Sequence, residues 1–105
     1  MSTSEDLREA AAYIEQHGMT KGCLQGSGGS VCMLGAINTV SGRQISTGHF
    51  LDSWMEANVG AAPIGKHGYA VLRPTAHWND HPETTQEDVL LWMKKAANDA
   101  EEQGL

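Results

Sequence analysis

The chain has 105 residues, of which 40% are apolar and 19% are charged, so its length and composition suit one globular domain over residues 1–105. Thirteen acidic residues against seven basic ones give a formal net charge of −6, and the basic residues form no cluster. This balance disfavours binding to nucleic acid or to an anionic membrane surface, and leaves DNA mimicry by an acidic surface as an open alternative.

No stretch of the sequence has the character of a signal peptide or a membrane span. Met1 is followed by polar residues at 2–6, and no apolar run approaches the roughly 18 residues that a membrane-spanning helix needs. We therefore expect a cytoplasmic protein. In a reducing compartment Cys23 and Cys32 should be free thiols, and two cysteines alone cannot complete a four-cysteine zinc site.

The first predicted helix begins within residues 2–4 and ends at about His17. Ser2 and Glu5 form one of two overlapping capping pairs at its start. The apolar residues of this segment recur at helical spacing and form a single stripe: Leu7, Ala10, Ala11 and Ile14. We expect this stripe to face the core.

Residues 18–30 contain five glycines and are expected to form a loop. The loop leads into a predicted central helix over 31–41, which has no charged side chain, is capped by Ser30 and is buried on nearly all sides. Glycines at 26–29 could cradle a phosphate at the start of this helix. The segment lacks the Gly-Lys-Ser/Thr ending of a nucleotide-binding loop, so we predict no nucleotide.

A third helix is predicted over 47–58, and a long stretch without helical period follows at 60–82. The expected apolar face of this helix consists of Phe50, Leu51, Trp54, Met55 and Asn58. Residues 69–72 could form a short strand, but a lone strand needs a partner.

The last predicted helix extends over 84–102. Thr84 and Glu87 have the spacing of a capping box, in which each side chain bonds the other residue's backbone N–H. Taken together, the elements predict a mainly α protein: a compact four-helix single domain with a glycine-rich loop and at most a short β-hairpin.

Short motifs in both halves of the chain form a distinctive combination. They are His17-Gly18-Met19, Lys21-Gly22-Cys23, Cys32-Met33-Leu34-Gly35-Ala36 and Trp78-Asn79-Asp80. This combination resembles a family of small uncharacterised proteins from actinobacteria and their phages, chiefly through the pair Cys-x-Leu-Gly-Ala and Trp-Asn-Asp. The resemblance implies a small accessory protein of a phage or mobile element, acting in the bacterial host, and implies no activity.

One hypothesis is thiol catalysis, with Cys32 as nucleophile, His77 as base, and Asn79 or Asp80 orienting the imidazole. The order Cys, His, Asn resembles that of papain-like enzymes, and a helix N-terminus favours the thiolate. The alternative is structural. Cys32 would then be a small buried residue, and Asn79 and Asp80 would form an Asx-type turn while Trp78 packs into the core.

A second hypothesis is a metal site. His77 and His81 lie four residues apart, with Cys23 and Cys32 as possible further ligands. Pro82 directly after His81 argues against both histidines lying on one helix. We therefore predict no metal ion and no cofactor.

The function that we favour from the sequence is a non-catalytic accessory protein, phage-encoded, that binds a host or phage protein. A small cysteine-dependent hydrolase or transferase using Cys32 and His77 is the first alternative, and a metal-stabilised binding module is the second. Protein binding requires an exposed apolar patch. We expect this patch to come from Met55, Val59, Ile64 and Tyr69.

Overall fold

The computed structural model describes residues 2–22, 25–42, 44–60 and 74–105. Within these ranges the chain forms five α-helices and one 3₁₀ turn, and no strand. The elements are α1 (Thr3–His17), η1 (Ser27–Gly29), α2 (Met33–Ser41), α3 (Gln44–Asn58), α4 (Pro74–Asp80) and α5 (Gln86–Glu102). The prediction of a mainly α protein is confirmed, whereas the predicted count of four helices is wrong because it omits α4.

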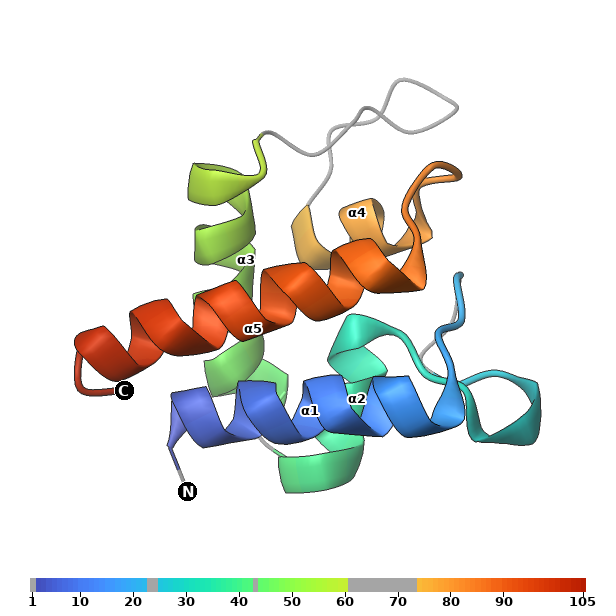
Figure 1. Cartoon of the computed structure of the whole chain (residues 1–105), viewed down its shortest axis with the longest axis horizontal. Coiled ribbons are helices and arrows are strands. Elements are labelled where there is room, and N and C mark those ends of the chain that lie inside the picture. Colours follow the sequence, from blue (N-terminus) through green and yellow to red (C-terminus); the bar gives the residue numbers. More distant parts are fainter. Residues whose placement is uncertain (1, 23–24, 43, 61–73) are drawn as a thin grey trace.

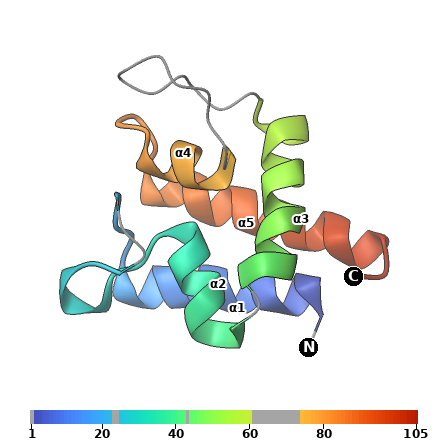
Figure 2. The same ribbon diagram turned by 180° about the vertical axis from the view of Figure 1, so that it is seen from behind.

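The helices form two layers (Figures 1 and 2). α1 and α5 run antiparallel, side by side, and make the most extensive contact among the described helices. α2, α3 and α4 lie across them as the second layer. The two ends of the chain meet, since the backbone N–H of Ser4 donates a hydrogen bond to the carbonyl of Leu105 at 3.4 Å.

The core lies between these layers and follows the predicted stripe of α1. Leu7, Ala10, Ala11 and Ile14 are all fully buried, which confirms the prediction. The facing stripe of α5 is equally inaccessible and consists of Val89, Met93, Ala96, Ala97 and Ala100. Small alanine side chains on both helices let α1 and α5 approach closely. Each large apolar residue in the core contributes about 1.5–3 kcal/mol of burial free energy.

The glycine-rich loop and α2 differ from the prediction in two respects. Cys32, not Ser30, is the N-cap of α2. The helix is buried only in its first half, since Asn38 and Thr39 are exposed. Val31 forms single bridges with two residues of the loop, so no hairpin develops in the described part of the chain.

α4 is the element that sequence reasoning missed. The expected Asx-type turn at Asn79 and Asp80 is wrong, because both residues belong to a seven-residue helix that begins at Pro74. Proline suits the first position of a helix, where its missing N–H would have no intrahelical partner. The predicted strand at 69–72 lies outside the described residues.

α3 begins at Gln44, three residues before its predicted start, and α5 has a different cap from the one predicted. The capping box of α5 consists of Thr85 and Asp88. Thr84 instead donates its hydroxyl hydrogen bond to the carbonyl of Trp78 at 2.6 Å, which fastens α4 to the start of α5. Among the described residues, no helix has the length and apolarity needed to cross a bilayer.

Candidate functional site

Cys32 lies at the start of α2, and 6% of the residue is exposed. Its Sγ accepts a hydrogen bond from the backbone N–H of Gly35 at 3.2 Å, which satisfies a donor that the first helical turn leaves free. Burial raises the pKa of the Cys32 thiol, and the negative charge of Asp80 acts in the same direction. The thiol is therefore protonated at neutral pH, unlike an activated nucleophile.

Asn79 is fully buried on α4 and ties three segments together. Its Oδ1 accepts from the backbone N–H of Met33 at 3.0 Å, and its Nδ2 donates to the carbonyl of Thr20 at 2.9 Å. Nδ2 also lies 3.1 Å from Oδ1 of Asp80, and this same oxygen accepts from the backbone N–H of Gly22 at 2.8 Å. One amide side chain thus joins α4 to the loop and to the N-terminus of α2.

The structure brings Cys32, Asn79 and Asp80 together without completing the predicted catalytic set. His77 is half-buried on α4, and in the described part of the chain it shares no hydrogen bond with Cys32. The Asn79 amide is occupied by backbone groups, so it does not orient the imidazole. We call Cys32, Met33, Asn79 and Asp80 the motif network, because they connect the two motifs. The hydrogen bonds of this network hold α4 against α2 and the glycine-rich loop, which is a structural role.

The glycine-rich loop suggests a phosphate cradle at the N-terminus of α2. Two first-turn N–H groups of α2 are already bonded, that of Met33 to Asn79 and that of Gly35 to Cys32. Gly28 and Gly29 have φ values of 69° and 85° and form the exposed 3₁₀ turn. Donors that already have protein partners offer little to an anion.

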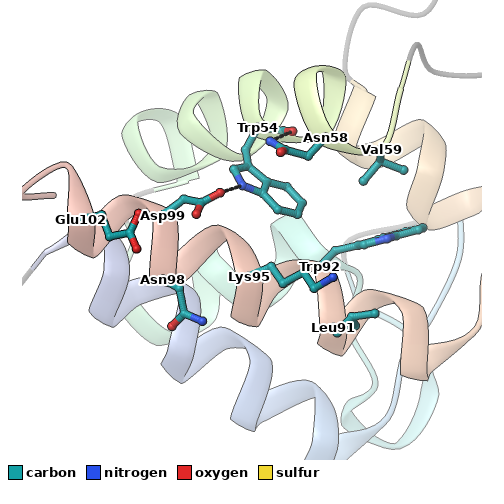
Figure 3. Close-up of a pocket in the computed structure, with 9 residues that line it drawn as sticks. All are labelled: Trp54, Asn58, Val59, Leu91, Trp92, Lys95, Asn98, Asp99 and Glu102. Atoms are coloured by element: carbon teal, nitrogen blue, oxygen red, sulfur yellow. Dashed lines mark hydrogen bonds between the residues drawn. The ribbon is translucent and has the colours of Figure 1, made fainter.

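A groove of about 660 Å³ between the C-terminal half of α3 and the outer face of α5 is the second candidate site (Figure 3). We call it the α3–α5 groove. It is lined by Trp54, Asn58, Val59, Leu91, Trp92, Lys95, Asn98, Asp99 and Glu102. Apolar, amide and charged side chains therefore share one concave surface, and binding sites are usually concave.

Two tryptophans give the α3–α5 groove a rigid form. The indole N–H of Trp54 on α3 donates to Oδ2 of Asp99 on α5 at 2.6 Å, which links the two walls. Trp92 is half-buried and meets Trp78 edge to face, with ring centroids 6.0 Å apart. Leu91, by contrast, is 51% exposed. The groove thus combines fixed aromatic side chains with an apolar side chain open to solvent.

The model of a family of unknown function, DUF6197, matches residues 1–99, a range that includes both motifs and most of the groove. The chain belongs to DUF6197. The search of curated proteins and the search of solved structures each found no match. Membership therefore establishes the family of the chain without assigning an activity to this DUF6197 protein.

The residues predicted to form the binding patch have different locations in the DUF6197 chain. Val59 lines the α3–α5 groove, whereas Met55 is fully buried because the apolar face of α3 turns inward at that position. Ile64 and Tyr69 lie outside the described residues. Sequence reasoning missed Leu91, although a leucine off the apolar stripe of the last helix was a signal for it.

The described part of this DUF6197 structure does not support the metal hypothesis. Within the described ranges, no three side chains of the histidine, cysteine, aspartate or glutamate type gather in a way that could hold an ion. Nδ1 of His81 accepts a hydrogen bond from the backbone N–H of Glu83 at 3.1 Å. Cys23 lies outside the described residues, so the structure does not test the hypothetical ligand set that includes it.

Proposed function

We propose that this protein is a non-catalytic accessory protein, encoded by an actinobacterial phage or mobile element, that binds a host or phage protein through the α3–α5 groove. The observation that carries the proposal is the groove itself. Half-exposed Leu91 shares the groove with Trp92 and Val59, and polar side chains line the rest of it. Aromatic and aliphatic side chains next to polar ones are typical of a protein interface.

The motif network supports this proposal by accounting for residues that would otherwise point to catalysis. A protonated, buried Cys32 thiol that caps a helix is suited to holding α2 in place. Asn79 also has a structural role, since its side chain hydrogen-bonds backbone groups of two segments. The protein is proposed to act in the cytoplasm of the bacterial host, without a cofactor and without contacting nucleic acid.

Affinity capture with matched surface variants tests the proposal. The tagged protein is incubated with a lysate of the organism that carries the gene, and captured proteins are compared between Leu91→Asp and Ile45→Asp. Ile45 is 77% exposed and lies outside the groove, so its variant controls for the loss of an exposed apolar side chain.

We expect one specific partner to be lost with Leu91→Asp and retained with Ile45→Asp. Circular dichroism should show both variants to be folded, because both residues are largely accessible to solvent. A partner that both variants retain, or the absence of any specific partner, would contradict the proposal.

A further inference from the structure

The α3–α5 groove is polarised along α5. Leu91 and Trp92 lie at one end together with Val59 of α3, and Asp99 and Glu102 lie at the other (Figure 3). Lys95 and Asn98 of α5 line the groove between these ends. The indole of Trp54 lies between the two ends. An occupant that matches this surface must be apolar at one end and bear a different chemistry at the other.

The end of the groove with Asp99 and Glu102 is suited to binding a positively charged group. The last turn of α5 has no basic residue, although the C-terminus of a helix carries a partial negative charge that carboxylates there reinforce. Arg8 bonds Glu101, at 3.0 Å, and leaves Glu102 without an ion pair among the described residues. A lysine or arginine brought by a partner would relieve this repulsion.

The length of the groove sets the length of its occupant. Leu91 and Glu102 are eleven positions apart on one helix, which corresponds to roughly 16 Å along its axis, or about three helical turns. Both walls are themselves helices, and a groove between helices is the usual receptor for the apolar face of a third one.

We infer that the α3–α5 groove receives an amphipathic helix of a partner protein, about three turns long, with apolar side chains at one end and lysine or arginine at the other. This inference rests on the proposed function and specifies its partner. The apolar residues pack on Leu91 and Trp92, and the basic residue pairs with Glu102. The net charge of −6 on the chain assists the approach of such a basic segment.

A displayed library of 16-residue helix-forming peptides, selected on the immobilised protein, tests the inference. Selected peptides are synthesised with a fluorescent label and titrated by anisotropy against the wild type, Leu91→Asp, Glu102→Lys and Glu9→Lys. Glu9 is exposed on α1 and serves as the control for the same change in net charge away from the groove.

We expect enriched peptides to carry lysine or arginine two to three turns from an apolar pair. Binding should weaken on the order of tenfold with Glu102→Lys, change little with Glu9→Lys, and be lost with Leu91→Asp. The effect of Glu102→Lys should shrink at high salt, because exposed charges are screened.

If selected peptides lose binding to the Leu91→Asp variant but bind the Glu102→Lys variant as tightly as the wild type, the partner helix does not need a basic end. The groove would then remain the binding site. Peptides indifferent to Leu91→Asp, or no enrichment at all, would overturn the inference; indifference would in addition contradict the proposed function. A homodimer that forms in the wild type and dissociates with Leu91→Asp would assign the groove to a second copy of the chain instead.

Discussion

Replacing Asn79 with alanine should destabilise the protein strongly, although a single uncharged side chain is removed. The change leaves the buried N–H of Met33 without its acceptor, which costs about 1–3 kcal/mol. Loss of the bond to the Thr20 carbonyl and the cavity left in a fully buried position each add about 1 kcal/mol. The total is about 3–5 kcal/mol, or about 12–40 °C in melting temperature for a domain of this size.

The measurement is urea unfolding followed by circular dichroism and tryptophan fluorescence. Asn38→Ala is the matched control, because Asn38 is an exposed asparagine on α2, and its variant should stay within about 0.5 kcal/mol of the wild type. An Asn79→Ala variant that stays equally close to the wild type would refute the structural role of the motif network. It would reopen a functional role for Asn79.

Three further results follow from the same contacts. Burial raises the pKa of the folded Cys32 thiol, so the native state keeps the thiol proton to higher pH than the unfolded chain does. The free energy of unfolding should therefore fall as the pH rises above the ordinary thiol pKa of 9.0. The Cys32→Ser variant should lack this pH-dependent loss of stability. In the native protein, iodoacetamide should modify Cys32 only at the rate of unfolding, and fast modification would count against its burial. Thr85→Ala should lower the free energy of unfolding by about 1 kcal/mol and accelerate hydrogen exchange at the Asp88 amide. An equal acceleration by Thr84→Ala would show that Thr85 is not the N-cap of α5.

The sequence predicts the long helices well because their apolar residues recur at helical spacing. The stripe of α1 is the clearest case, since each of its four members is fully buried. α4 escaped prediction because seven residues give less than two turns of periodicity, and its Asn-Asp pair is typical of a turn. Tertiary contacts stabilise the helical form of α4, chiefly those of buried Asn79 and Thr75.

The candidate site was predictable only in part. A cysteine is not a usual helix cap, so propensity favoured Ser30 over Cys32. The bond from the Met33 N–H to Asn79 and the electrostatic effect of Asp80 on Cys32 depend on how α4 packs against α2, which no local pattern reveals. Half-buried Val59 of the predicted patch lines the groove, but the opposite wall comes from α5, where Leu91 is one helical position away from the buried stripe.

The central claim is that the α3–α5 groove binds a partner while the motif network holds the fold. A ¹H–¹⁵N NMR titration with the captured partner tests both halves at once, through the indole N–H of Trp54 and the side-chain amide of Asn79. We expect the Trp54 signal to shift on binding and the Asn79 signal to stay in place. A shift of the Asn79 amide with an unmoved Trp54 indole would contradict the account and place the binding site at the motif network.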